Sequence, residues 1–213
     1  MKAFLRALAL GAGCLAAPVA QAQVSKFHGS LGGSAVSLRA HYIEQANPYG
    51  YSGTAPGYVI KDIAAMPLVL TGNLGFDAPL LQFGGGEQSL GVSLNAAAGL
   101  MGSKQEGTDG FNEQLILDFP QYATYRFGAR ASKHSQKDFG VGVGVGYRFC
   151  RFFLPFSAPS AMLEGVYATA DTDWFLRVSG DLRATRYYTY LSSEGPVEAL
   201  RLRAFTVLVG KSF

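Results

Sequence analysis

The sequence predicts an all-β protein, an eight-stranded antiparallel up-and-down β-barrel, and three observations lead to this prediction. Apolar and polar residues alternate with a period of two along most of the chain, and no segment keeps a helical period. Glycine, phenylalanine and tyrosine are abundant, whereas charged residues make up 15% of the chain, against roughly 25% in ordinary soluble domains. Long and short connections alternate between these segments along the chain, as expected for a series of hairpins.

The first 22 residues are predicted to be a signal peptide. Lys2 and Arg6 precede a short apolar run, and Ala22 ends a small-x-small cleavage pattern, so we expect the mature chain, 23–213, to begin at Gln23. The apolar run is too short to be a membrane helix. The protein is therefore expected to be exported, with the barrel domain occupying the whole mature chain.

Eight segments of the mature chain are predicted to be strands. They are 34–46, 58–83, 87–102, 113–132, 138–151, 159–170, 172–191 and 196–213. The second is long and Pro67 interrupts it, so it forms either one strand with a bulge or an extension, or two strands. The segment 138–151 reads DFGVGVGVGYRFCR, with Val on one face and Gly on the other.

The glycine face of segment 138–151 predicts room for large neighbours. If a hairpin turn joins this segment to the strand before it, Arg126 lies opposite about Gly144 and Arg130 opposite about Gly140. Facing residues of an antiparallel pair point the same way, so the glycines would leave space for the two arginine side chains.

Six arginines lie on the face opposite the apolar side chains within their own strands. They are Arg39, Arg126, Arg130, Arg148, Arg177 and Arg183. A charged interior with an apolar exterior is what a lipid-spanning barrel requires, and in hydrocarbon its sheet must close. Eight strands enclose space for side chains only, so we expect a packed, polar, closed lumen and no porin channel. Glu164 and Asp181 are the expected acid partners, with Arg148, Glu164 and Arg177 forming one network.

Alternation shows that two faces differ, but not which one is inside. A soluble, lipocalin-like barrel that carries a periplasmic ligand would keep the same period with the faces reversed. The low charge favours the membrane barrel, and so do the aromatic residues near the ends of the apolar faces, which suit interfacial girdles. These residues are Tyr42, Tyr147, Phe149, Trp174, Tyr188, Tyr190 and Phe213.

The final segment, AFTVLVGKSF, resembles the closing strand of bacterial outer-membrane barrels, which ends in an aromatic residue after alternating apolar residues. Phe205, Val207, Val209 and Phe213 match that pattern, and Lys211 departs from it. Together with the signal peptide and the strand pattern, the chain resembles the small outer-membrane barrels of the OmpA/OmpX kind and the "outer membrane β-barrel domain" proteins. The resemblance implies a bacterial outer-membrane location, contact with outer-membrane lipids, and recognition of Phe213 by the barrel-assembly machinery.

No arrangement of residues predicts catalysis, a metal site or a cofactor. His134 and Ser135 are adjacent in a turn, whereas outer-membrane lipid A deacylases separate the two residues by one and carry them on a strand. The formal net charge of +3 does not indicate nucleic-acid binding. We therefore expect a non-enzymatic structural or surface-interaction role. A lipid-modifying enzyme and a soluble ligand carrier are the alternatives, and a ligand of the external loops is left open.

Overall fold

The computed structural model describes residues 26–45, 58–104, 111–132, 135–151, 154–170, 172–191 and 195–213. The predicted signal peptide lies outside the described residues. The described part of the chain contains no helix long and apolar enough to cross a membrane.

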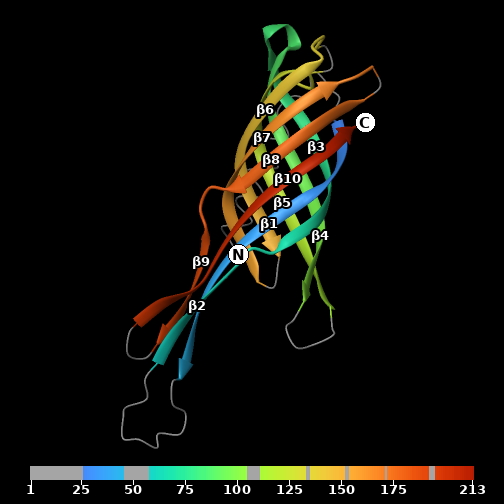
Figure 1. Ribbon diagram of the computed structural model, residues 1–213. Coiled ribbons are helices and arrows are strands. Elements are labelled where there is room, and N and C mark those ends of the chain that lie inside the picture. Colours follow the sequence, from blue (N-terminus) through green and yellow to red (C-terminus); the bar gives the residue numbers. More distant parts are fainter. Residues whose placement is uncertain are drawn as a thin grey trace, which may run out of the picture.

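Ten strands and one helical turn make up the described structure. The strands are β1 Lys26–Gln45, β2 Tyr58–Ala65, β3 Leu68–Phe83, β4 Gln88–Lys104, β5 Phe111–Gly128, β6 Phe139–Arg151, β7 Pro155–Ala168, β8 Asp173–Asp181, β9 Thr185–Leu191 and β10 Gly195–Ser212, and the 3₁₀ turn η1 is Gly84–Gly86. Neighbours pair antiparallel in the order β2-β1-β3-β4-β5-β6-β7-β8-β10-β9, and β1 also pairs with β10. This last pairing closes a barrel of eight strands, which confirms the predicted fold class (Figure 1).

The second predicted strand is divided into two strands, β2 and β3, which keep the same register with β1. It breaks at Pro67, which has no backbone N–H to donate to a neighbouring strand. On one side of the break Leu38 lies opposite Ala65, in β2. On the other side Ala35 lies opposite Leu68, in β3, so the register with β1 does not change. β3 is therefore the wall strand, and β2 continues it past the barrel.

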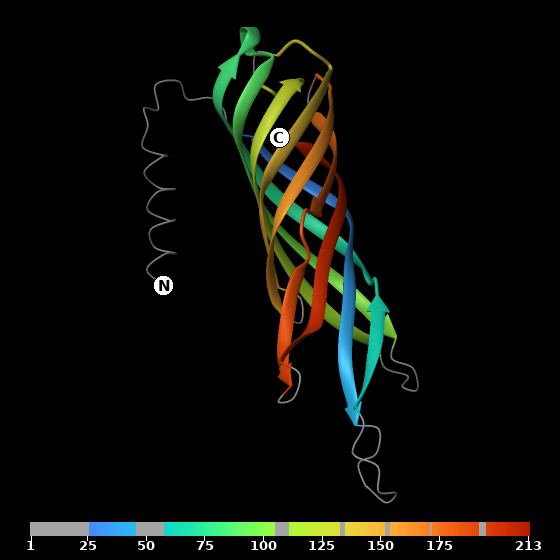
Figure 2. The same ribbon diagram turned by 90° about the vertical axis from the view of Figure 1, so that its left-hand side faces the viewer.

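The seventh predicted strand is not one strand, because the chain bends at Leu182–Ala184 between β8 and β9. Gly180 lies opposite Phe205, whereas Thr185 lies opposite Leu202, so the register with β10 shifts across the bend. β9 pairs with β10 and β2 pairs with β1 beyond the barrel. These four strands project from the end opposite the C-terminus (Figures 1 and 2).

The first strand differs from its prediction in extent and in orientation. β1 begins at Lys26, eight residues before the predicted start at 34. Val36, one of the apolar side chains on the face opposite Arg39, is buried inside the barrel, and Arg39, which was expected to face the lumen, is exposed. The reason is that the lumen at this level holds an apolar cluster, so the apolar face of β1 turns inward there.

Most of the remaining wall strands carry apolar side chains outward, as predicted, and β10 departs from the rule, because Leu200, Leu202, Ala204 and Leu208 are buried and Arg201 and Arg203 lie on its other face. Exposed apolar side chains include Leu31, Leu70, Leu74, Leu94, Leu100, Leu115, Val143, Val145, Leu163, Leu176 and Val209. Several exposed aromatic side chains lie toward the two ends of the wall, with Phe27, Phe139, Tyr167, Trp174 and Phe213 toward the C-terminal end and Phe119, Tyr147 and Phe149 toward the other. The side chains of Tyr42 and Tyr190 lie outside the described set.

Candidate functional site: the charged lumen

A cluster of five charged side chains fills the lumen in the half of the barrel that holds the C-terminus. Its members are Asp77 of β3, Arg126 of β5, Arg130 of the β5–β6 turn, Glu164 of β7 and Arg177 of β8. All five are buried, and we call them the Asp77–Glu164 cluster. They come from strands that are mostly not adjacent, so their contacts cross the lumen.

Glu164, which has no exposed surface, is held by arginines on both sides. Its carboxylate accepts from Arg126 Nε at 3.1 Å and from Arg177 Nε at 2.9 Å and Nη2 at 2.5 Å. Arg130 Nη1 lies 3.7 Å from the same carboxylate. Charge-assisted bonds of this kind are the stronger class of protein hydrogen bonds.

Asp77 is the second acid of the cluster. It accepts from Arg126 Nη2 at 2.9 Å and from Arg130 Nη2, and Arg177 Nη2 lies 3.9 Å away. His28 of β1, which is also buried, places Nε2 3.5 Å from the Asp77 carboxylate. Three guanidinium groups therefore share two carboxylates, which leaves the cluster with one excess positive charge when His28 is neutral.

Phe175 covers the end of the cluster with its ring. The guanidinium carbons of Arg130 and Arg177 lie 4.7 and 5.2 Å from the ring centroid. The His28 ring meets it edge-on at 5.2 Å. A ring face attracts a cation, most strongly where water is excluded, so Phe175 offsets part of the excess positive charge.

The glycine face of β6 makes room for this cluster, and the glycine opposite Arg126 lies two residues from the predicted one. Arg126 lies opposite Gly142 rather than Gly144. A Cβ on Gly142 would lie 3.2 Å from Arg126 Cγ and 3.5 Å from Glu164 Cβ, so a larger residue would press on both side chains.

The two-residue difference arises in the turn after β5. Gly128 and Arg130 both have positive φ, at 79° and 67°, so β5 ends at Gly128, which pairs with Gly140. Arg130 was expected opposite Gly140 on a strand. It lies instead in the turn and reaches into the lumen from the end of the barrel.

Arg148 belongs to a second cluster, nearer the projecting end. Its Nε lies 3.2 Å from Asp118 Oδ2 and its Nη1 lies 3.5 Å from Asp181 Oδ1. Its Nη2 also donates to the hydroxyls of Ser179 at 3.2 Å and Thr206 at 3.0 Å. One cation thus faces two acids, which is the opposite imbalance to that of the Asp77–Glu164 cluster.

The structure brings Arg177 to Glu164 but not Arg148, so the three residues do not form the single network expected from the sequence. Arg148 lies opposite Ala158 on β7, six residues before Glu164. Six strand residues span roughly 20 Å, which is beyond the reach of an arginine. Arg183 is exposed in the bend after β8 and has no place in the lumen.

Polar and apolar side chains fill the rest of the lumen. Asn73 donates to Ser30 at 3.1 Å, and Asn95 accepts from Arg177 Nη1 at 2.6 Å. Toward the projecting end follows an apolar cluster of Val36, Val69, Met101, Ile116, Cys150, Phe156, Leu200, Leu202 and Ala204. Three cavities among the described lumen residues have about 10 Å³ each, which is about the space of a single water.

The sequence reasoning missed Asp77, Asp118, Asn95 and His28. Asp118 and Asn95 share the inward parity of Arg126 and Ser93 in their own strands, so the period of two contained the signal. Asp77 and His28 lie in segments where no inward face had been assigned.

Of the two residues compared with the deacylase pair, the structure describes Ser135 alone. Ser135 lies in the β5–β6 turn, where its hydroxyl accepts from the Lys137 backbone N–H at 3.4 Å. His134 lies outside the described residues, as does the side chain of His41. Cys150 is buried in the apolar cluster. The described part of the chain contains no group of His, Cys, Asp and Glu that could hold a metal ion.

No protein-family model matches the sequence, and a search of curated proteins returns no match. Among solved structures, the chain is similar to the outer membrane protein OprG from Pseudomonas aeruginosa, with a TM-score of 0.47 and 13% identity over 90% of this chain and 97% of that one. Ail of Yersinia pestis, in complex with a heparin analogue, has a TM-score of 0.37 and 10% identity over 89% and 99% of the two chains. The outer membrane protease OmpT from Escherichia coli has a TM-score of 0.38 and 10% identity over 88% and 96%. These likenesses concern the overall shape of the chain.

Proposed function

We propose that this protein, a transmembrane β-barrel of the bacterial outer-membrane type, has a structural or surface-interaction role and does not conduct solutes. The apolar exterior, the aromatic side chains at both ends of the wall and the buried charges support its place in the membrane. The single observation that carries the closed lumen is the Asp77–Glu164 cluster, which joins β3, β5, β7 and β8 across the interior.

The packing of the lumen supports the absence of conduction. A solute entering from the C-terminal end would meet the Asp77–Glu164 cluster, then the Arg148 cluster, and then the apolar side chains around Leu202. An eight-stranded barrel has an interior just wide enough for side chains to fill. A path for ions would therefore require several buried ion pairs to break together.

A role at the surface is supported by the four projecting strands. Among the described residues, β2 pairs with β1 alone, and β9 pairs with β10 alone. The edge of β9 is partly covered, because the Tyr187 hydroxyl donates to the Pro155 carbonyl and Thr185 Oγ donates to the Ser157 carbonyl at 2.7 Å. The projecting strands offer a surface on which an extracellular partner would bind.

Two measurements test the proposal. The protein should remain with membranes during carbonate extraction, and recovery as a folded soluble protein would contradict the membrane assignment. In planar bilayers the pure protein should give no stable conductance under conditions where a reference porin gives clear steps. Reproducible large steps that depend on the amount of this protein would contradict the closed lumen.

The proposed absence of enzymatic activity has its own test. A lipid-modifying enzyme would change the mass of lipid A, so lipid A from cells with and without the protein should give the same mass spectrum. A mass shift that appears with the protein would overturn this part of the proposal and favour the lipid-modifying alternative.

A further inference from the structure

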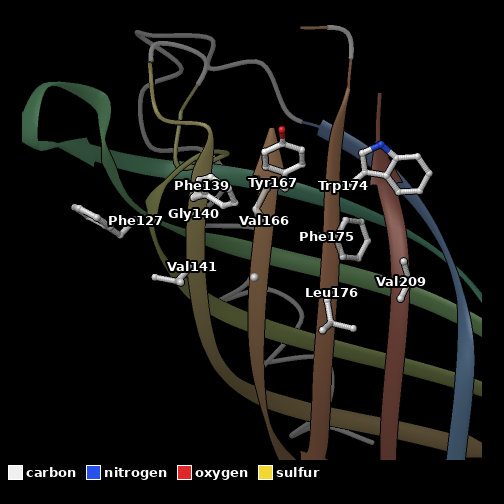
Figure 3. Close-up of a pocket in the computed structure, with 11 residues that line it drawn as sticks. Phe127, Phe139, Gly140, Val141, Val166, Tyr167, Trp174, Phe175, Leu176 and Val209 are labelled. Atoms are coloured by element: carbon white, nitrogen blue, oxygen red, sulfur yellow. The ribbon is translucent and has the colours of Figure 1, made fainter. Parts of the chain in front are cut away.

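An apolar groove of about 690 Å³ lies on the outer face of the barrel, across β6, β7, β8 and β10. Figure 3 shows Phe139, Tyr167 and Trp174 around it, with Leu176 on the same strand as Trp174 and Val209 on β10. Its volume falls within the range of about 300–1,000 Å³ of sites that bind small molecules. The groove is at the end of the barrel that holds the C-terminus.

The groove exists because one outward-facing residue of β7 has no side chain. Gly165 lies opposite Val141 on β6 and Leu176 on β8, and all three face outward. A Cβ on Gly165 would have no heavy atom within 4 Å. The hollow therefore has open space above an intact sheet, and a larger residue at this position would fill it without straining the backbone.

A cation lies at the rim of the groove. Phe139, Tyr167, Trp174 and Lys211 are register partners in one outward-facing row across four strands. The Phe139 and Tyr167 ring centroids are 4.9 Å apart, and Lys211 lies directly opposite Trp174. Asp173, the nearest acid in this register, is engaged by Lys26. An apolar hollow, an aromatic row and an exposed ammonium thus follow one another toward the end of the barrel.

We propose that the groove binds one anionic glycerophospholipid, with an acyl chain over Gly165 and the phosphate at Lys211. The proposal rests on the proposed membrane location and specifies which lipid meets this wall. Barrels of the outer-membrane type carry their short turns on the periplasmic side, and η1 and the β7–β8 turn lie at the groove's end of the barrel. The leaflet on that side consists of glycerophospholipid. Aromatic rings suit the interface between headgroup and acyl chain, and a lysine there attracts an anionic headgroup.

Trp174 reports on this site, because it lines the groove and is the sole tryptophan of the sequence. The protein is reconstituted into phosphatidylcholine vesicles that contain increasing fractions of phosphatidylglycerol with brominated acyl chains, which quench nearby tryptophan. Half-maximal quenching should need an about fivefold lower fraction of brominated phosphatidylglycerol than of brominated phosphatidylcholine, the ratio expected for one lysine at an anionic lipid surface.

Variants separate the groove from general lipid contact. Gly165→Leu should abolish the difference between the two brominated lipids, and Lys211→Gln should also bring their ratio to one. Ala98→Leu, which places the same side chain at another outward-facing position, should leave the ratio unchanged. Native mass spectrometry provides a second readout, in which wild type and Ala98→Leu retain one phosphatidylglycerol and Gly165→Leu does not.

Three results would overturn the proposal. They are equal quenching by the two brominated lipids in the wild type, an unchanged ratio in Gly165→Leu, and displacement of the phosphatidylglycerol by an equal fraction of lipid A. Failure of the membrane assignment looks different, since then neither brominated lipid would quench Trp174.

Discussion

Glu164→Gln tests the charged lumen with almost no change in side-chain volume. The substitution removes the negative charge that Arg126 and Arg177 contact at 2.5–3.1 Å and leaves Asp77 as the only acid of the Asp77–Glu164 cluster. The excess charge of the cluster rises from one to two in a fully buried setting. Removing one partner of a buried ion pair costs about 3–5 kcal/mol, because the remaining charge is stranded. We expect a loss of that size in the free energy of unfolding.

The matched control is Glu87→Gln, which removes an ion pair of similar length on the surface. Lys137 Nζ lies 3.3 Å from the Glu87 carboxylate, and the two side chains are 42% and 38% exposed. Exposed pairs contribute about 0–1 kcal/mol, so this variant should unfold almost like the wild type. Denaturant titrations in detergent or lipid, followed by Trp174 fluorescence and heat-modifiable gel mobility, give both values. Equal midpoints for the two variants would refute the argument that the Glu164 charge holds the lumen together.

Two further predictions concern the C-terminal residue Phe213 and the closely packed Gly146. Deleting Phe213 should lower the yield of folded protein in outer membranes, because by resemblance the assembly machinery recognises the terminal aromatic residue. Lys211→Tyr should leave the yield unchanged or raise it. A full yield of folded protein without Phe213 would contradict this reasoning. Gly146→Ala should reduce the folded fraction, because the new Cβ would lie 1.8 Å from the Gln121 carbonyl oxygen. Gly165→Ala should not reduce it, because a Cβ there meets no heavy atom within 4 Å. A similar loss of folded protein in both variants, measured by heat-modifiable gel mobility, would contradict the packing argument.

The fold was predictable because a barrel repeats one simple rule along the chain. In β4, β5, β6 and β8 the outward face is more apolar than the inward face, so alternation predicted how these segments are oriented. The rule failed in β1, where Val36 packs into an apolar part of the lumen and Ser37 and Arg39 are exposed on the other face. The two faces do differ in polarity, but at this level the apolar face points into the lumen, so polarity alone gives the wrong orientation.

The register of the β5–β6 hairpin was less accessible, since it depends on the turn. Positive φ at Gly128 is common for glycine, but positive φ at Arg130 is rare for a side chain of its size. Nothing local in the sequence indicates that this arginine leaves the strand, so the predicted register of β5 with β6 differs from the observed one by two residues. The contacts of Arg130 with Asp77 and Phe175 in the lumen accompany this conformation.

The ion-pair partners could not be read from hairpins alone, because most contacts cross the lumen. Strand neighbours explain the pair of Glu164 and Arg177, which face each other on β7 and β8. They do not explain Arg126, which lies on β5 and contacts Asp77 on β3 and Glu164 on β7. Such partners become neighbours through the curvature of a closed wall, and a one-dimensional pattern does not contain that curvature.

This cross-lumen arrangement has a consequence for assembly. A bond between β3 and β5, or between β5 and β7, skips the strand between them, so it forms after the sheet has curved into a barrel. A register slip of one residue would turn each inward arginine toward lipid, at about 2–4 kcal/mol for each one near the middle of the membrane. A buried ion pair often stabilises a fold no more than apolar residues of the same size would. We infer that the Asp77–Glu164 cluster disfavours misaligned barrels, because one closed register satisfies its five charges together.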